Sequence, residues 1–308
     1  MELTIIGCSG SFPGPESPAS CYLLSAEHEG RTWRIILDLG NGALGKLQQH
    51  MALEDLDAVC LSHLHPDHYM DLCGLHVAIR WRPGGWPGEH LPVYGPATTD
   101  QRIANAYGME PDPGMHPDFD FRSWTPRQAE RIGPFTITPV PVRHPIEEAY
   151  ALRVEVAGRD GQVRTLTYSG DTDACEELIE AARDADVFLC EAAFEDGRDD
   201  HIEGVHLNGA RAGTMARTSG VGRLLLTHIP VWTSQQVLLE HARANYPGGI
   251  AVAVSGVTYQ VQSASERQAQ DGVDHQGVPA AQSAAEQPAA QPAGQPAGPP
   301  REDRERTA

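Results

Sequence analysis

Lysine is almost missing from this chain of 308 residues, in which Lys46 is the single example and arginine carries nearly all of the positive charge. Acidic residues outnumber Lys and Arg by 42 to 23, which gives a formal net charge of −19. Broad binding to nucleic acid needs a basic surface, because Lys and Arg neutralise the phosphates. The charge therefore argues against such a function, but it leaves room for a small phosphate ester held in a metal-rich cleft.

Long apolar runs and paired cysteines are also lacking. No stretch approaches the ~18 consecutive apolar residues that a membrane-spanning helix needs, and the opening MELTIIGCSG has no basic region like that of a signal peptide. These features predict a cytoplasmic protein that does not bind a membrane. The six cysteines include no C-x-x-C pair, which predicts buried, reduced thiols rather than a disulfide framework.

The composition changes near Ser263. From there on the chain is rich in Pro, Ala, Gln and Gly, as in QPAAQPAGQPAGPP, and it shows no apolar periodicity. Such a segment cannot bury enough apolar surface to offset the entropy that is lost when it becomes ordered. The sequence therefore predicts a disordered C-terminal tail over residues 263–308, to which we assign no function.

Short apolar runs separated by turn residues fill the part before the tail. Their length and composition predict strands, at residues 3–7, 34–40, 58–63, 91–95, 135–142, 150–156, 164–171, 186–192, 223–228 and 250–256. Apolar residues at helical spacing predict helices, at 172–185, 208–220 and 233–246. Strands with helices between them predict an α/β sandwich, with two sheets inside and helices outside.

One segment, LSHLHPDHYMD, holds three histidines and an aspartate within six positions, directly after a predicted strand. Loops at strand ends carry much of the chemistry of folded proteins. His63 and His65 are two positions apart and can face the same way, and a proline then turns the chain so that Asp67 and His68 can face a second point. Because imidazole and carboxylate groups suit Zn²⁺, the segment predicts parts of two adjacent metal sites.

Three later strands also end in a residue of a metal-binding type. His144 follows FTITPVPVR, Asp171 ends LTYSGD and His228 ends LLLTH. Any one of them has an ordinary explanation, such as an aspartate that caps a turn. Together with the histidine-rich segment they make four strand ends with such a residue, which is improbable by chance, so we predict that they meet in one site.

The order of these residues resembles that of the metallo-β-lactamase fold. HLHPDH at 63–68 is similar to its H-x-H-x-D-H motif, and His144, Asp171 and His228 match its later motifs in order. The resemblance covers residues 1–258, and it implies one catalytic domain built as a four-layer αββα sandwich. It also implies two metal ions. We expect Zn²⁺, although Mn²⁺ or Fe²⁺ also occupy sites of this type.

The resemblance assigns the metal ligands residue by residue. Three histidines would hold one ion, and an aspartate and two histidines would hold the other: His63, His65 and His144 for the first, and Asp67, His68 and His228 for the second. Asp171 would bridge the two ions. A carboxylate at the bridge is typical of the phosphodiesterase branches, whereas the β-lactamase branches often have a cysteine, so Asp171 favours phosphoester chemistry.

Two further residues resemble the ribonuclease Z-like phosphodiesterases. Glu191 ends the strand of ADVFLCEA, and His206 opens the helix of HLNGARAGTMA. In that branch a histidine faces the leaving oxygen and a glutamate orients the histidine, which implies His206 as general acid and Glu191 as its partner. Asp67 is the third implied catalytic group, because it would both bind a metal and orient the attacking, metal-bridging hydroxide.

Several longer segments narrow the resemblance. GCSGSFPGPESPASCYLL, LDLGNGALGKLQ, SGDTDACEELIEAARDADVFLCEA and LLLTHIPVWTS are similar to the mycobacterial-type cyclic-nucleotide phosphodiesterases of actinobacteria. This resemblance implies hydrolysis of 3′,5′-cyclic nucleotides, such as cAMP to AMP. Related enzymes are often dimers, so the resemblance is compatible with a homodimer.

The main alternative substrate is the 3′ end of tRNA, as in ribonuclease Z. Enzymes that cut tRNA generally carry a Gly/Pro-rich arm, which in the bacterial form lies between the third histidine and the bridging aspartate. Here His144 and Asp171 are 27 positions apart, which leaves room for one hairpin. This spacing and the acidic charge favour a small phosphodiester, although some relatives without the arm do process tRNA.

Other functions remain open on the same fold, namely a thioester or lactone hydrolase and a metal-binding module without catalysis. A lactone hydrolase would not need the glutamate–histidine pair, and a degenerate module would have lost ligands, of which none is missing. For a substrate base, Trp81, Trp86 and Phe119 are candidates either to stack on adenine or to pack against the core. The glycine-rich loop 7–20 is either a plain loop or backbone that approaches a phosphate.

Overall fold

The computed structural model describes every residue except 159, 264–265 and 267–308. The predicted tail therefore lies almost entirely outside the described residues, and both its disorder and the domain boundary at 258 stay predictions. Within the described part, no helix combines the length and the apolar character that crossing a bilayer requires. The six cysteines are all unpaired thiols, in line with the absence of C-x-x-C.

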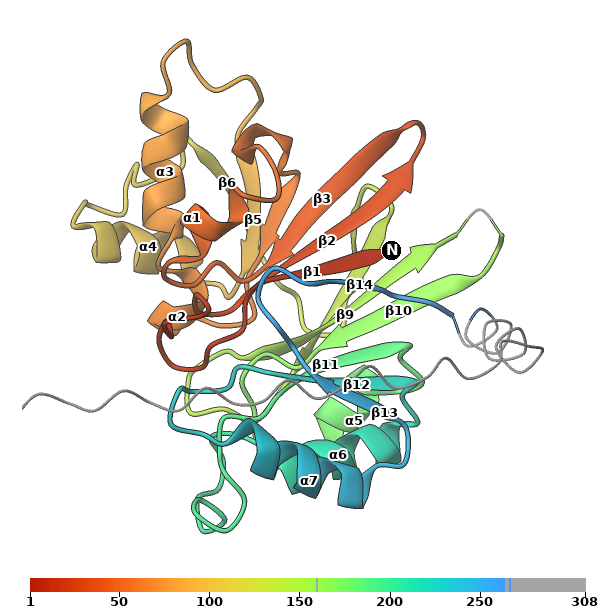
Figure 1. Ribbon diagram of the computed structural model, residues 1–308. Helices are drawn as coiled ribbons and strands as arrows, with labels where there is room; N and C mark the ends of the chain where they lie inside the picture. Colours follow the sequence, from red (N-terminus) through yellow and green to blue (C-terminus); the bar gives the residue numbers. More distant parts are fainter. Residues whose placement is uncertain (159, 264–265, 267–308) are drawn as a thin grey trace, which may run out of the picture. The chain divides into compact units, whose positions relative to one another are not determined.

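Two mixed sheets of seven strands each form the centre of the fold (Figure 1). The first has the order β14-β1-β2-β3-β4-β5-β6 and the second the order β13-β12-β11-β10-β9-β8-β7. The first sheet consists of β1 (Glu2–Gly7), β2 (Cys21–His28), β3 (Arg31–Leu37), β4 (Ala58–Cys60), β5 (Leu91–Gly95), β6 (Phe119–Ser123) and β14 (Thr258–Gln260). The second consists of β7 (Glu130–Ile132), β8 (Phe135–Pro141), β9 (Tyr150–Ala157), β10 (Val163–Tyr168), β11 (Val187–Glu191), β12 (Arg223–Thr227) and β13 (Gly249–Val252).

Helices cover the outer face of each sheet (Figure 1). The first sheet is covered by α1 (Ala43–Leu47), the 3₁₀ turn η1 (Leu53–Asp55), α2 (Pro66–Tyr69), α3 (Leu72–Trp81) and α4 (Thr99–Tyr107). The second is covered by α5 (Glu176–Ala182), α6 (Gly209–Ser219) and α7 (Gln235–Asn245). The helices end as their sequences indicate. The side chain of Asn208 caps α6, for example, and Gly220 ends it in the left-handed conformation that glycine adopts without strain.

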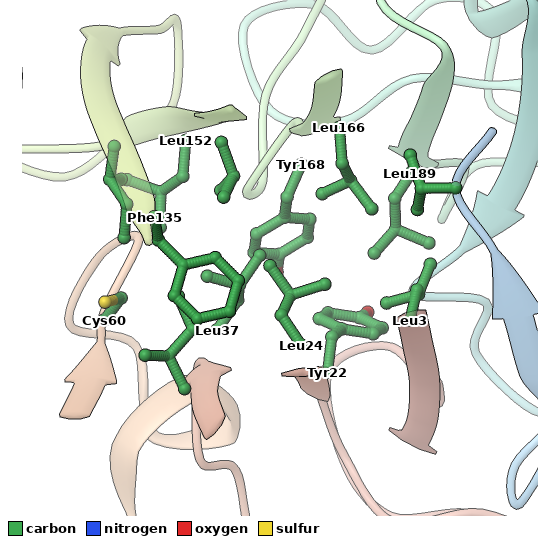
Figure 2. Close-up of a cluster of buried hydrophobic side chains, with 14 of the residues drawn as sticks. Leu3, Tyr22, Leu24, Leu37, Cys60, Phe135, Leu152, Leu166, Tyr168 and Leu189 are labelled. Atoms are coloured by element: carbon green, nitrogen blue, oxygen red, sulfur yellow. The ribbon is translucent and has the colours of Figure 1, made fainter. Parts of the chain in front are cut away.

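Three apolar clusters separate the resulting four layers. The central cluster lies between the sheets and takes side chains from both, such as Leu24 and Leu37 from the first and Leu166 and Leu189 from the second (Figure 2). A second cluster joins the first sheet to its helices, and a third joins the second sheet to α5, α6 and α7. The predicted αββα sandwich is therefore confirmed.

Strand direction explains where the polar residues gather. Strands β3 to β6 run parallel in the first sheet, and β10 to β13 run parallel in the second. The carboxyl ends of parallel strands meet at one edge of a sheet, where open α/β sheets bind their ligands. An isolated bridge between His63 and Ala149 joins the two sheets at that edge, so both sets of strand ends face a common site.

The predicted strands and helices are present, but several elements were missed. The predicted elements did not include the strands β2, β6, β7 and β14 or the helices α1 to α4. Helix α3 had a readable signal, because its buried residues Leu72, Leu75, His76 and Ile79 follow a helical period. Strand β14 had none, because its three residues are too few to give a pattern.

Candidate metal centre

The nine residues predicted from the sequence lie in one region, at the carboxyl ends of the parallel strands. They form three sets, two of which share Asp171, and within each set the ligand-type atoms lie within 4.8 Å of one another. The sets are His63, His65 and His144; Asp67, His68, Asp171 and His228; and Asp171, Glu191 and His206. We call the first set the outer group and the second the inner group. Their roles as ligands and catalytic groups stay predictions.

The outer group is made of three imidazoles that converge on one point. Nδ1 of His65 lies 3.1 Å from Nε2 of His63 and 3.0 Å from Nε2 of His144. The Nδ1–H of His144 donates to the carbonyl oxygen of Val205 at 2.8 Å, so its Nε2 keeps a lone pair for a cation. His63 is fully buried, whereas His65 and His144 are half-buried.

The inner group is buried throughout and carries two carboxylates. Nε2 of His68 lies 3.3 Å from Oδ2 of Asp67 and 3.3 Å from Oδ2 of Asp171. Nε2 of His228 lies 3.2 Å from the same oxygen of Asp171. Two imidazoles and two carboxylates that face one another in this way form a ligand set for a divalent cation.

Asp171 is the member of the inner group that also faces the outer group. Its Oδ2 atom is 3.8 Å from Nε2 of His63 in the outer group, and it also contacts the inner imidazoles. Asp171 comes three residues after the end of β10, and Gly170 before it adopts a φ of 58°, which favours glycine. A carboxylate in this place can share its oxygens between two cations.

Several buried side-chain atoms in the inner group have no hydrogen-bond partner in the part of the chain that the structure describes, which is evidence on whether the group fits a cation. Oδ2 of Asp67, Nε2 of His68 and Oδ1 of Asp171 are buried and have no hydrogen-bond partner among the described residues. Buried polar atoms are normally hydrogen-bonded, because an unpaired buried group costs about 1–3 kcal/mol. Coordination of a cation by these lone pairs removes that cost, so the donor set fits divalent metal ions.

Asp38 supports the candidate site and has no signal in the sequence that would single it out. This fully buried carboxylate follows β3, and its Oδ2 accepts hydrogen bonds from Nδ1 of His68 at 2.7 Å and from the hydroxyl of Tyr168 at 2.8 Å. It also accepts from the backbone N–H and the hydroxyl of Ser62. Asp38 thereby fixes the ring of His68 with Nε2 toward the inner group, as carboxylates behind metal-binding histidines do.

His228 is held in a comparable way. Its Nδ1 lies 2.9 Å from the hydroxyl of Ser20, which is fully buried. The backbone N–H of Ser11 reaches its Nε2 at 3.3 Å. The loop can come this close because residue 10 is glycine, where a Cβ would overlap the carbonyl oxygen of His228. The glycine-rich loop 7–20 therefore lines the site and is not a plain loop over the sheet.

Glu191 and His206 form a hydrogen-bonded pair beside Asp171. Oε1 of Glu191 accepts from Nδ1 of His206 at 2.8 Å and from the backbone N–H of Thr172 at 2.9 Å. Its Oε2 accepts from the backbone N–H groups of Ala193 and Leu207. Because Nδ1 of His206 is committed to the carboxylate, Nε2 is the ring nitrogen that is left for a substrate.

The pKa of His206 is raised to about 9. Burial acts against this, because it disfavours the charged ring, but the attraction of Glu191 and then of Asp171 outweighs burial. This balance favours the protonated form of the ring. A protonated imidazole that is fixed in one orientation beside a metal-type site has the properties of a general acid.

Comparison with known proteins identifies the family. The chain matches the Beta-lactamase superfamily domain over residues 33–229. It is 42% identical over 267 residues to an uncharacterized protein of Mycobacterium tuberculosis, which covers 86% of this chain and 93% of that protein. It is 32% identical over 261 residues to the probable metallo-hydrolase YhfI of Bacillus subtilis, which covers 84% of this chain and all of YhfI, 100%.

Structures and more distant relatives agree with this assignment. The crystal structure of YhfI matches with a TM-score of 0.71 and 30% identity, over 84% of this chain and 99% of YhfI. A ribonuclease Z of Methanosarcina acetivorans is 26% identical over 273 residues, which covers 74% of this chain and 87% of that enzyme. This chain belongs to the beta-lactamase superfamily and is a metallo-hydrolase, a family whose activity depends on divalent metal ions.

Proposed function

We propose that this metallo-hydrolase is a phosphodiesterase that opens 3′,5′-cyclic nucleotides, with cAMP converted to AMP as the main reaction. The observation that carries the proposal is the Glu191–His206 pair, held beside a carboxylate that lies between two sets of metal-type ligands. Hydrolysis of a phosphodiester needs a nucleophilic water and a proton for the leaving alkoxide. The site offers a separate group for each task.

The ligand sets fit two cations. The outer group would hold one and Asp67, His68 and His228 the other, with Asp171 shared between them. Two divalent cations bound there would supply an acidified water and would stabilise the charge of the phosphoryl group. We favour Zn²⁺ for this mixture of imidazole and carboxylate ligands, with Mn²⁺ or Fe²⁺ as substitutes.

The residues of the chain have distinct roles in the proposed reaction. Oδ2 of Asp67 would accept a hydrogen bond from the attacking water and orient it toward phosphorus. Nε2 of His206 would donate its proton to the leaving ribose oxygen, in line with the attack. Glu191 would keep the imidazole of His206 in place, because its two oxygens are fixed by three backbone N–H groups. General acid catalysis of this kind contributes about 10²–10⁴-fold to the rate.

The preference for a small substrate rests on what surrounds the site. Between His144 and Asp171 the described residues form the simple hairpin of β9 and β10, with no extension that would grip a tRNA. The net charge of −19 also opposes the approach of a large polyanion. The similarity to a ribonuclease Z keeps tRNA 3′-end processing as the second candidate function. A thioester or lactone hydrolase fits less well, because it has no need of the Glu191–His206 pair.

The test compares the two substrates directly. Purified protein supplied with Zn²⁺ or Mn²⁺ is assayed on 3′,5′-cAMP and on a tRNA precursor with a 3′ trailer, with Asp67→Ala as the inactive control. We expect release of AMP from cAMP and an intact precursor. Cleavage of the precursor with no turnover of cAMP would assign the protein to ribonuclease Z activity instead. Light scattering of the same sample tests the homodimer that the resemblance allows.

A further inference from the structure

Two aromatic side chains, Trp232 and Phe12, meet at the surface beside the candidate metal centre. Their ring centroids are 4.9 Å apart, and the ring planes meet at 43°. Trp232 is 58% exposed, and Phe12 is half-buried. By contrast, Trp124 is buried and donates its indole N–H to a backbone carbonyl, as tryptophan in a core usually does. Packing of the core therefore does not explain Trp232.

Both loops that carry this pair also contact the metal centre. Phe12 directly follows Ser11, whose N–H reaches Nε2 of His228. Trp232 lies four positions after His228 on the other loop. The two loops are joined by a hydrogen bond from the N–H of Ile229 to the carbonyl oxygen of Cys8 at 3.1 Å. Phe12 is thus one residue from the backbone N–H that contacts His228, and consecutive Cα atoms are about 3.8 Å apart.

The loop that carries Trp232 is fixed by side-chain hydrogen bonds. The guanidinium of Arg198 donates to the carbonyl oxygen of Trp232 at 3.0 Å and to the hydroxyl of Thr233 at 3.2 Å. That hydroxyl donates in turn to the carbonyl oxygen of Ala193 at 2.9 Å. The backbone is thus held while the indole stays exposed. A rigid, exposed ring binds a ligand with little loss of conformational entropy.

We propose that Trp232, supported by Phe12, is the surface on which the nucleobase of the substrate stacks. This inference rests on the proposed phosphodiesterase function and extends it to recognition of the nucleoside. Every base has a flat π face, so an aromatic side chain binds it without reading its edges. The stacking surface would hold the base while the phosphate lies at the metal centre, and it would favour nucleotides over other phosphodiesters.

The size of the pair fits a base better than a second copy of the chain. An aromatic side chain buries about 150–250 Å² when it is covered, whereas each partner in a stable complex buries about 800 Å². Two rings are therefore too small to hold a dimer by themselves. The two rings also belong to loops that carry His228 or contact it, which ties them to the site rather than to a remote surface.

The aromatic residues that the sequence suggested for a base do not lie in such a place. Phe119 is 1% exposed and packs in the cluster between the first sheet and its helices. Trp86 packs against the same cluster. Trp81 is 73% exposed, but it ends α3, and ten helical residues place it about 15 Å along the helix from the start. Trp81 is therefore a matched control, since it is exposed and lies away from the site.

The test measures binding rather than turnover. Isothermal titration gives the affinity of the Zn²⁺-loaded protein for AMP and for ribose 5-phosphate, which lacks the base. The variants are Trp232→Ala, Trp232→Phe, Phe12→Ala and Trp81→Ala. We expect Trp232→Ala to weaken AMP binding by about 5- to 150-fold, the range for loss of one stacked base. Affinity for ribose 5-phosphate should stay unchanged, Trp232→Phe should keep most of the affinity for AMP, and Trp81→Ala should behave as the wild type.

Three binding results would overturn the inference. They are wild-type affinity of Trp232→Ala for AMP, an equal loss of affinity for AMP and ribose 5-phosphate, and failure of the wild-type protein to bind AMP. A change of oligomeric state in Trp232→Ala, seen by light scattering, would also overturn it in favour of a contact between two copies. If AMP binding depends on Trp232 but cAMP is not hydrolysed, the stacking surface stands and the proposed reaction fails.

Discussion

The inner and outer groups of the candidate metal centre differ in how their side chains are held. Each inner imidazole is fixed from behind by a fully buried side chain, His68 by Asp38 and His228 by Ser20. In the outer group, Nδ1 of His63 lies 3.1 Å from the buried hydroxyl of Ser62, but His144 is held by a backbone carbonyl, and two of the three rings are half-buried. The inner group also carries two carboxylates, whereas the outer group has none of its own.

The comparison indicates which group of side chains is already held in the arrangement that a cation needs. Ligands whose rings are locked by buried partners lose little freedom when they coordinate a metal, and buried carboxylates attract the cation strongly. We therefore expect the inner group to bind its cation more tightly. Two of the three rings of the outer group are half-buried, and the group has no carboxylate of its own, so we expect its cation to exchange more readily.

Removal of Asp171 should have the largest effect on turnover, because its carboxylate faces both the inner and the outer group. Asp171→Ala takes away the carboxylate that lies between the groups and leaves buried imidazoles facing one another. Since charge stabilisation by such cations is worth several kcal/mol and each 1.36 kcal/mol is tenfold, turnover should fall at least about 10,000-fold. Metal analysis should find both cations reduced. Full retention of one of them would mean that Asp171 serves a single group.

His206→Ala should have the second-largest effect, and metal binding by the inner and outer groups should be the same as in the wild type. We expect kcat to fall by about 100- to 10,000-fold, because the leaving oxygen loses its proton donor. Metal content by mass spectrometry should be unchanged. Loss of metal in this variant would make His206 a ligand or a structural residue rather than an acid.

Asp38→Asn tests how the inner group is held. The change removes the carboxylate that accepts from His68, so the affinity for the inner cation should fall by about 10- to 100-fold, as is typical for residues behind metal ligands. The outer cation should be less affected. The matched control is Asp186→Asn, another buried aspartate whose carboxylate accepts from the backbone of Thr165 at the far end of the second sheet. If both variants lose metal equally, the effect comes from lost stability.

Ser20→Ala should have the smallest effect. The hydroxyl beside Nδ1 of His228 is one neutral hydrogen bond, which is worth about 0.5–1.5 kcal/mol. We therefore expect about a 2- to 12-fold loss of affinity for the inner cation. Ser219→Ala, which removes a buried hydroxyl in α6, is the control and should leave metal affinity as it is. A loss as large as that of Asp38→Asn would mean that Ser20 holds His228 as strongly as Asp38 holds His68.

The sequence predicted the strand-end residues because strand ends become neighbours in parallel sheets. His63, Asp171 and His228 are far apart in the chain, yet each follows a strand whose carboxyl end lies at the same edge. A polar residue that directly follows an apolar run can therefore be placed at the carboxyl edge of the sheet. Glu191 also ends a strand, but it was singled out by the likeness to known motifs, which supplied the order of the ligands as well.

The supporting residues could not be predicted in this way. Asp38 ends an apolar run like many turn aspartates, and its partners His68 and Tyr168 are 30 and 130 positions away. Val205 contributes a carbonyl oxygen, which every residue has, so no residue type marks it. Trp232 follows a predicted ligand in the sequence, but its exposure and its contact with Phe12 depend on how two loops meet.

The account is tested most directly by anomalous diffraction from crystals grown with Zn²⁺ and measured on both sides of the zinc absorption edge. It predicts two anomalous peaks about 3.5–4 Å apart, one bound by the outer group and one by the inner group, with Asp171 between them. It also predicts the lower occupancy at the outer group. A single peak, or a peak bound by His206 and Glu191, would contradict the proposed division of the site.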